Sequence, residues 1–405
     1  MRILFLTQYY PPEVGAPQNR LHELAVRLKS KGLEIEVLTA MPNYPSMEID
    51  ERYKNGKIKE EVLDGIKVHR SKIYVSKSKS IFKRLLNYFS FVFTSYFRGR
   101  KLDEFDYLLV ESPPLFLGYS AILLSKRLKA KLIFNVSDLW PESAEKLGLV
   151  TNKAFLKLAY NLEKKCYNKS FLITGQTNGI VQSIRSRFPD KDVYWLPNGV
   201  DLSFYNPENI NSTFRKNKGF EDKDLLLFYG GIIGYAQGLD LILRAAEKLK
   251  EYSNIKFILQ GSGPEKARLL EMKKVLNLDN VFFFNPVGKK EMPAILAQID
   301  VALVPLKKLE LFTGAIPSKI FEALSMKKPL LLGVDGEAKG HFIDKANAGF
   351  FFEPENEDDL IEKILQFFNN KELILEMGSN GRDYVIKNFN RDNISSGFYK
   401  KLKLN

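Results

Sequence analysis

The sequence contains little cysteine and little histidine. Among its 405 residues, Cys166 is the single cysteine, and the histidines are His22, His69 and His341. One cysteine excludes a disulfide within the chain and is typical of a reducing cytosol. Three scattered histidines and one cysteine do not supply the ligands of an ordinary His/Cys zinc site. We therefore expect neither a disulfide framework nor a structural zinc.

Long apolar runs are also lacking. No run reaches the roughly 20 apolar residues that a membrane-spanning helix needs. The N-terminal stretch MRILFLTQYYPP is basic and then apolar, but its apolar part is too short for the core of a signal peptide, and prolines follow it. We expect a strand there and place the chain in the cytoplasm.

Acidic residues are fewer than basic ones. The chain has 61 Lys and Arg against 48 Asp and Glu, a net charge of +13. Such an excess favours nucleic acid, an anionic membrane surface or acidic ligands, and it does not constrain the fold. An apolar content of 45% is ample for packed cores, and the length indicates two domains.

Short apolar runs alternate with amphipathic stretches along both halves of the chain, which indicates an α/β fold with parallel sheets. The predicted strands are residues 3–7, 34–38, 107–111, 131–136, 171–174, 193–196, 225–229, 256–259, 281–284 and 301–305. The predicted helices are residues 19–30, 117–128, 239–252, 265–276 and 290–298, and residues 359–404 are also helical.

Two Rossmann-like domains with a cleft between them are the architecture that this pattern predicts. Their expected extents are residues 1–199 and 200–384, with a hinge at the turn cluster of residues 197–201. The terminal helix, about residues 385–405, is expected to cross back onto the first domain. Ligands of such sheets bind at the carboxyl ends of the strands.

The stretch of residues 314–334, GAIPSKIFEALSMKKPLLLGV, predicts a loop, a helix and a buried strand. Pro317 and Ser318 suit the helix start, and Lys327 and Lys328 suit its last turn. Lys319 and Glu322 are three residues apart and share one face. A cation, an anion and free N–H groups at a helix start suit an anionic ligand. The alternative is a solvated ion pair worth ~0.5 kcal/mol or less.

Two glycine-rich segments follow predicted strands of the second domain. Gly230, Gly231 and Gly234 are predicted to form a loop after the first strand, with Gln237 as a neutral donor beside the ligand. Gly261 and Gly263 follow the next strand. Glycines let backbone N–H groups approach a phosphate closely, although an ordinary βα turn is the alternative. The pattern is not that of a nicotinamide-binding loop.

Two polar clusters follow strands of the first domain. Gly15 lies in the loop after the first strand, before Gln18 and Arg20, where we expect it to face donor phosphates; a plain turn is the alternative. Asp138 lies with Trp140 just past a strand end, which suits sugar recognition. There the alternative is a helix cap by Asp138 with Trp140 packed below it.

Residues 72–101 form a basic segment with an aromatic centre at residues 81–97, which predicts an interfacial helix on the inner face of the cytoplasmic membrane. A buried helix with basic ends and a base-stacking surface are the alternatives. Its basic residues are Lys72, Lys77, Lys79, Lys83, Arg84, Arg98, Arg100 and Lys101.

Several of these segments resemble one family over nearly the whole chain. YYPPEVGAP, LPNGVD, YGGIIGYAQGLDLILRAA, LQGSGPEK and PSKIFEALSMKKPLLL are similar to motifs of the retaining glycosyltransferases of family 4, which have the GT-B fold. VSDLWPES and GYAQGLD look most like the branch that includes bacterial L-fucosamine transferases of surface-polysaccharide synthesis.

The resemblance implies transfer of a sugar, an N-acetylated amino sugar in this branch, from a UDP-sugar to a lipid-linked glycan in capsule or O-antigen synthesis. It implies retention, no required metal and no other cofactor. Lys319 and Glu322 would act at the diphosphate and the ribose, and together with Asp138, which we select for its place past a strand end, they are the candidate catalytic residues. The donor-binding residues would be Gly15, Gly230, Gly231, Gln237, Gly261, Gly263, Pro317, Ser318, Lys319 and Glu322.

The chain departs from the family pattern at two places. Many members carry a glutamate eight residues before the position of Glu322, where this chain has Gly314. Many also carry an Arg and a Lys in the glycine loop, where this chain has Gly231 or Ile232, and Gln237. The same changes are typical of the fucosamine-transferase-like branch, so we interpret them as a variant donor site.

Two other functions are compatible with part of the pattern. A UDP-N-acetylglucosamine 2-epimerase shares the GT-B architecture but needs acid and base side chains, for which the shortage of histidines is unfavourable. A nucleic-acid binder would use the net charge of +13, but the sequence contains no recognised nucleic-acid motif. We expect no nucleic-acid partner.

Overall fold

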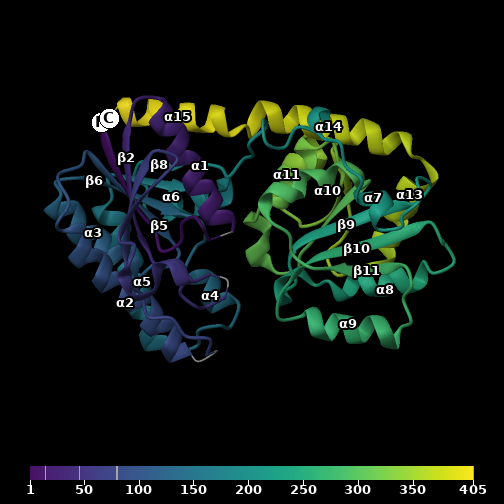
Figure 1. Cartoon of the computed structure of the whole chain (residues 1–405), viewed down its shortest axis with the longest axis horizontal. Coiled ribbons are helices and arrows are strands. Elements are labelled where there is room, and N and C mark those ends of the chain that lie inside the picture. The colour runs from purple at the N-terminus through teal and green to yellow at the C-terminus, as the bar shows by residue number, and fades with distance from the viewer. Residues whose placement is uncertain (14, 45, 79–80, 405) are drawn as a thin grey trace. The chain divides into compact units, whose positions relative to one another are not determined.

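The computed structural model describes residues 1–13, 15–44, 46–78 and 81–404, so Lys79 of the basic segment lies outside the described residues. The chain forms two α/β units (Figure 1). Met1–Asn198 and Asp392–Asn405 make the N-terminal unit, and Gly199–Arg391 makes the C-terminal unit.

The N-terminal unit is built on an eight-stranded sheet with the order β3-β4-β2-β1-β5-β6-β7-β8. Its strands are β1 (Arg2–Leu6), β2 (Glu34–Ala40), β3 (Glu60–Leu63), β4 (Ile66–Ser71), β5 (Tyr107–Ser112), β6 (Lys131–Val136), β7 (Leu172–Gly175) and β8 (Val193–Trp195). All neighbours are parallel except the β3–β4 hairpin. The sequence analysis missed that hairpin, although Asp64-Gly65, both with positive φ, is a strong two-residue hairpin signal.

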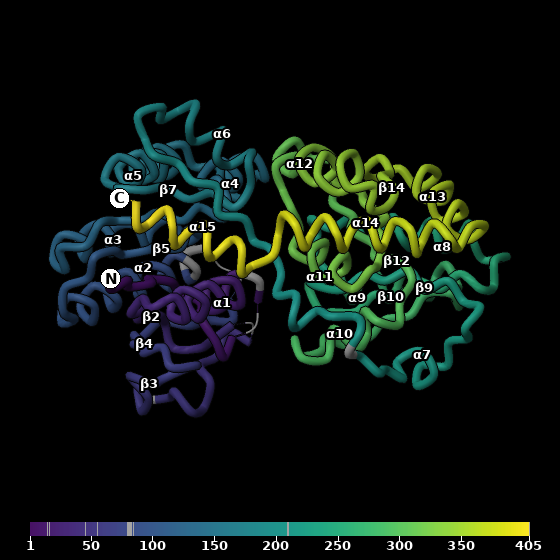
Figure 2. The backbone as a smooth tube through the Cα atoms, turned by 90° about the horizontal axis from the view of Figure 1, so that it is seen from above, coloured from purple at the N-terminus to yellow at the C-terminus, as the bar shows by residue number. Residues whose placement is uncertain are grey.

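Helices cover both faces of this sheet. They are α1 (Ala16–Ser30), α2 (Ile81–Gly99), α3 (Leu117–Arg127), α4 (Glu142–Lys146), α5 (Lys153–Lys169), α6 (Asn178–Arg187) and α15 (Arg391–Lys403), and η1 (Glu51–Gly56) is a 3₁₀ helix. The buried faces of α2, α3 and α5 form one core with the sheet. On the other face, α1 and α15 contribute to a second core, and Figure 2 shows α15 running beside α1.

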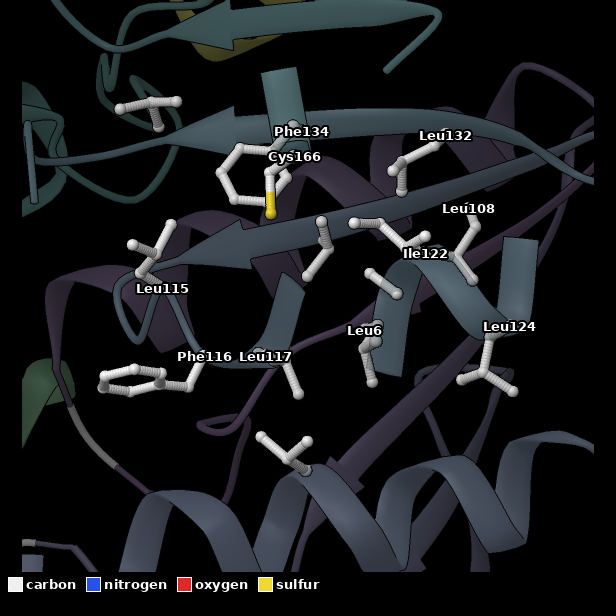
Figure 3. Packing of buried hydrophobic residues seen from close by; sticks show 14 of the residues in the cluster. Leu6, Leu108, Leu115, Phe116, Leu117, Ile122, Leu124, Leu132, Phe134 and Cys166 are labelled. Atoms are coloured by element: carbon white, nitrogen blue, oxygen red, sulfur yellow. The ribbon is translucent and has the colours of Figure 1, made fainter. Parts of the chain in front are cut away.

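The single cysteine is a packing residue of the first core. Cys166 of α5 is fully buried beside Phe134 (Figure 3). A Cβ on Gly118 of α3 would lie 2.3 Å from the Cys166 sulfur, so the missing side chain allows α3 and α5 to approach each other. Burial raises the pKa of the Cys166 thiol to about 12. The thiol is therefore a protonated packing group.

The C-terminal unit contains a six-stranded parallel sheet with the order β11-β10-β9-β12-β13-β14. Its strands are β9 (Leu225–Ile232), β10 (Ile255–Ser262), β11 (Val281–Phe284), β12 (Val301–Pro305), β13 (Leu330–Gly333) and β14 (Gly349–Phe351). Its helices are α7 (Phe214–Asn217), α8 (Asp240–Lys248), α9 (Lys266–Val275), α10 (Met292–Gln298), α11 (Lys319–Ser325), α12 (Glu337–Lys339), α13 (Glu357–Asn369) and α14 (Glu372–Asn388). The short turns are η2 (Pro207–Asn209), η3 (Tyr235–Gln237), η4 (Lys289–Glu291), η5 (Glu310–Gly314) and the π-helical η6 (Gly340–Lys345).

Figure 1 shows α8 and α9 on one side of this second sheet and α10 and α11 on the other. The first side buries the apolar faces of α8, α9 and α13 against β9 and β10. Loops at the carboxyl ends of β9, β10, β12 and β13 are therefore held between two packed layers, which suits a binding edge.

Candidate functional site

Lys319 and Glu322 of α11 lie at the carboxyl edge of the second sheet. Both are partly exposed, and both line a cavity of about 30 Å³ together with Gly230 and apolar side chains that include Met292 and Leu296. The sequence prediction that the two charged residues share one helix face is confirmed. Their environment differs from that of a solvated surface pair.

The Lys319 ammonium lies 3.7 Å from the centroid of the Tyr229 ring. Within the described residues, no carboxylate or hydrogen-bond acceptor is paired with it. Burial lowers the pKa of Lys319 to about 7, and attraction by Glu322 opposes that shift only in part. The site thus contains an ammonium group with no direct ion-pair or hydrogen-bond partner in the described residues, whose charge Glu322 offsets only in part.

Glu322 has partners that the sequence did not reveal. The Tyr205 hydroxyl donates a hydrogen bond to its carboxylate, and Arg391 and Lys289 add positive charge nearby. Burial is the largest effect and raises the pKa of Glu322 above its ordinary value. Because Tyr205 and Arg391 are far from Glu322 in sequence, no local pattern could have identified them.

The start of α11 differs from the predicted helix. Lys319 is its first residue, so Pro317 and Ser318 precede the helix, and the Pro317 carbonyl accepts from Ile320 N at 3.1 Å. The helix ends at Ser325, so placing Lys327 and Lys328 in its last turn is wrong. Lys327 instead has φ of 58°, the left-handed conformation that often follows a helix end.

The glycine loop predicted at residues 230–234 is wrong for its first three residues. Gly230, Gly231 and Ile232 continue β9 and pair in register with Gln260, Gly261 and Ser262 of β10. A Cβ on Gly261 would lie 1.8 Å from the Gly231 carbonyl oxygen, and φ of Gly261 is 157°. Glycine is therefore required by close backbone packing, which the sequence pattern does not distinguish from phosphate binding.

Gly231 is exposed although it lies within this paired region, and it is beside Lys319. A Cβ on Gly231 would be 3.2 Å from the Lys319 ammonium. Gln237 ends the turn η3, and its side-chain oxygen fills the space beside Gly234. A Cβ on Gly263 would clash with the Ile233 carbonyl oxygen, so the backbone packs closely there. The predicted donor-binding residues of this unit therefore lie along the carboxyl edge of the second sheet. Most of them pack against neighbouring residues of the protein.

Gly15 caps α1 in the N-terminal unit with an extended φ of 176°, which any residue can adopt. The Gln18 side-chain oxygen occupies the space of a Cβ at Gly15, at 2.4 Å. Arg20 points into the unit and donates to Glu111 at 2.5 Å and to Ser137 at 2.9 Å. Arg20 is thus bound to a buried carboxylate.

Asp138 anchors the start of α4 in the same unit. It accepts from the Ser143 hydroxyl at 2.8 Å, and burial raises its pKa. Trp140 packs edge-on against Phe116 and Phe155. The packing of Trp140 matches the packing alternative, whereas Asp138 is not the cap of α4, whose N-cap is Pro141. The catalytic role of Asp138 stays a prediction.

The helix α2 has two different faces. Phe91 and Val92 are buried in the core, and the Ser95 hydroxyl is 3.0 Å from that of Ser120 on α3. Phe93 and Phe97 are 63% and 53% exposed. No helix of the described residues is both long enough and apolar enough to cross a membrane.

Some basic residues of this segment are already paired. Lys77 lies 2.6 Å from Glu48, and Arg98 lies 2.8 Å from Glu60. Arg100 lies over the exposed Phe97 ring at 4.9 Å. Thus only part of the predicted positive charge is available to an anionic surface.

Comparisons with known proteins agree with this architecture. Residues 18–204 match the model described as Glycosyltransferase Family 4, and residues 210–384 match Glycosyl transferases group 1. The putative colanic acid biosynthesis glycosyl transferase WcaI of Escherichia coli K12 is 25% identical over all of both chains. The O-antigen chain mannosyltransferase C of Escherichia coli is 21% identical over 98% of this chain and 97% of its own.

A solved structure extends the likeness to the whole fold. Anabaena Alr3699/HepE in complex with UDP and glucose has a TM-score of 0.73 at 16% identity, covering all of both chains. The two units therefore carry a glycosyltransferase family 4 domain and a glycosyl transferases group 1 domain in one GT-B fold, and the chain is a glycosyltransferase similar to enzymes of surface-polysaccharide synthesis.

Proposed function

We propose that this enzyme transfers an N-acetylated amino sugar from a UDP-sugar to a lipid-linked glycan, with retention and without a required metal. The observation that carries the proposal is the Lys319 ammonium, which lies beside the exposed Gly231 with no acidic partner in the described residues. A diphosphate supplies the negative charge that this site lacks. The complex of Anabaena HepE with UDP supports UDP as the nucleotide.

The chemistry follows from charge development. The bond between the sugar C1 and the diphosphate oxygen breaks, and negative charge grows on the departing diphosphate. Lys319 and the backbone N–H groups near Gly231 stabilise that charge. The acceptor hydroxyl attacks C1 from the face of the leaving group, and its proton passes to the diphosphate. Glu322 binds the ribose hydroxyls as a carboxylate.

The proposed donor sugar, acceptor and membrane binding are each supported by a different observation. The motifs VSDLWPES and GYAQGLD resemble fucosamine-transferase-like enzymes, which favours an N-acetylated amino sugar. The likeness to WcaI and to the O-antigen mannosyltransferase favours a surface-glycan acceptor. Exposed Phe93 and Phe97 on α2 favour peripheral binding to the inner face of the cytoplasmic membrane, where a lipid-linked acceptor is held.

The test is a transfer assay with a panel of UDP-sugars and a lipid-linked saccharide, read out as UDP release and product mass. We expect Lys319→Met to lower kcat/KM at least ~10-fold, because the cation acts on the transition-state charge. Lys308→Met is the matched control, since Lys308 is exposed and pairs with Glu353 at 2.6 Å.

Three results contradict parts of the proposal. Equal turnover of Lys319→Met and wild type removes Lys319 from the diphosphate site. An epimerised UDP-sugar formed without acceptor identifies a 2-epimerase. An inverted anomeric configuration of the product, read by NMR, overturns retention.

A further inference from the structure

Lysines near the carboxyl edge of the second sheet include Lys266, Lys307, Lys308 and Lys319, and these differ in their partners. Lys266 donates to the Gly261 carbonyl at 3.0 Å and to the Asn285 side chain at 3.2 Å. Lys308 pairs with Glu353. Lys319 and Lys307 have no acid or hydrogen-bond acceptor for their ammonium groups in the described part of the chain.

The two unpaired lysines are held in the same way. Lys319 lies over the Tyr229 ring, and Lys307 lies 3.2 Å from the centroid of the Tyr235 ring. A ring face fixes the position of an ammonium group without forming hydrogen bonds to it. Its N–H donors remain available for an anion.

Both tyrosines belong to the same segment of chain. Tyr229 precedes Gly230 in β9, and Tyr235 opens η3 shortly after Gly231. Lys307 follows β12, the neighbour of β9 in the sheet, and its backbone N–H donates to the Ala236 carbonyl at 2.9 Å. Two cations from the one connection between β12 and β13 therefore lie beside the glycine-containing segment that follows Tyr229.

Neither ammonium group has an ion-pair partner in the described residues, and burial disfavours the charged form of Lys319, which the attraction of Glu322 offsets only in part. An anion with two adjacent charged groups supplies a partner for both lysines. The Lys307 side chain also passes close to Gly238, where a Cβ would lie 3.4 Å from its Cγ. The absence of a side chain at Gly238 leaves room for this approach.

We propose that Lys307 is the second diphosphate-binding cation of the donor site and that Tyr235 is its positioning residue. This inference rests on the proposed function, because it takes a nucleoside diphosphate as the ligand. Lys319 and Lys307 then contact the two phosphate groups.

The experiment measures affinity by calorimetry for UDP, UMP and uridine. We expect Lys307→Met to weaken UDP binding about 10-fold or more, UMP binding less, and uridine binding not at all, since a charged hydrogen bond is lost only where a phosphate is present. Lys308→Met is the control and should match wild type for all three ligands.

Tyr235 provides a test of positioning. Its ring face contacts Lys307, so Tyr235→Phe should retain UDP affinity and Tyr235→Ala should lose several-fold. In turnover assays, Tyr235→Ala should raise KM for the donor, and the Phe variant should rescue it. Equal behaviour of the Phe and Ala variants contradicts the positioning role.

The outcomes separate this inference from the proposed function. If wild type binds UDP and Lys319→Met weakens that binding while Lys307→Met does not, only the role of Lys307 is overturned. If Lys307→Met weakens uridine and UDP equally, the residue acts through the fold or the base, and the inference is again overturned. If wild type binds no nucleotide and Lys319→Met changes no turnover, both proposals fail.

Discussion

Lys319 carries a charge that the residues around it do not neutralise. Burial lowers its pKa to about 7, so the free enzyme contains a mixture of charged and neutral lysine near neutral pH. Only the charged form attracts a diphosphate, and a bound diphosphate in turn favours the charged form. Ligand binding and protonation are therefore coupled at this one residue.

This coupling predicts weaker UDP binding as pH rises above 7. From pH 7.5 to 9.0 the neutral fraction of free Lys319 grows, so Kd should increase by at most about tenfold per pH unit. The window lies above the titration of the UDP phosphate, whose last pKa is about 6. Calorimetry across this range should show the slope in wild type and a flat profile in Lys319→Met. A flat profile in wild type contradicts the lowered pKa.

The same residue predicts a conflict between function and stability. The folded pKa of about 7 lies below the ordinary lysine pKa of 10.5, so the unfolded state binds more protons between these pH values. Stability contributed by Lys319 therefore rises with pH through that window. Lys319→Met should raise Tm at pH 7, by about 2–4 °C for each kcal/mol gained, and the gain should shrink by pH 10. Thermal unfolding at both pH values checks this; a lower Tm at pH 7 contradicts it.

Sequence and structure agree at the residue scale only where contacts are local. Lys319 and Glu322 could be paired from their helical spacing. The Tyr229 ring under Lys319 and the Tyr205 hydroxyl on Glu322 could not, because they come from distant segments. The partner of Arg20 in α1 could not be identified for the same reason, since Glu111 lies in β5, far along the chain.

At the scale of the element, most strands were predictable because buried parallel strands are short, continuous apolar runs. The residues at which strands and helices end were less predictable. β9 and β10 extend through their glycines because Gly231 and Gly261 pair in register, whereas glycine is usually taken to end a strand. The helices α8 and α11 are shorter than their apolar patterns, since periodicity does not specify where the last turn stops.

The close backbone contact at Gly261 predicts a large effect of one methyl group. Gly261→Ala places a Cβ against the Gly231 carbonyl and also forces a positive φ on alanine. We expect a loss of at least about 2 kcal/mol of stability, together with weaker UDP binding. Gly340→Ala is the control, because nothing lies within 4 Å of its Cβ position. Equal urea midpoints for the two variants contradict the close contact.

The outward face of α2 predicts binding to anionic vesicles. Phe93→Ser with Phe97→Ser removes two exposed rings, so the bound fraction should fall several-fold, since interfacial binding scales with buried apolar area. Leu375→Ser is the control: it removes an exposed leucine, 74% exposed, from the C-terminal unit. Co-sedimentation with anionic and neutral vesicles provides the measurement. If both variants bind vesicles as well as the wild type does, the exposed face of α2 is not the membrane-binding surface.

At the scale of the whole molecule, the chain crosses between its two units twice. The first crossing follows Asn198 and the second follows Arg391. The crossing segments are hydrogen-bonded to each other, from Val200 N to the Phe389 carbonyl at 2.9 Å and from Arg391 N to the Val200 carbonyl at 3.1 Å. The end of the chain thus completes the unit in which the chain begins.

Because α15 belongs to the N-terminal unit, we predict that the stability of this unit depends on α15. Phe398 and Leu402 of α15 are buried with Ile3 and Phe5 of β1, and the Tyr107 hydroxyl donates to the Leu402 carbonyl at 3.1 Å. Phe398→Ala should cost about 3–5 kcal/mol, because it removes a ring from a closed core and leaves a cavity. Leu404→Ala, at a position 85% exposed, is the matched control and should be nearly neutral. Hydrogen exchange resolved by segment should show the loss in β1, β2 and β5 of the Phe398 variant. Protection that falls only in the C-terminal unit would mean that α15 does not complete the N-terminal core.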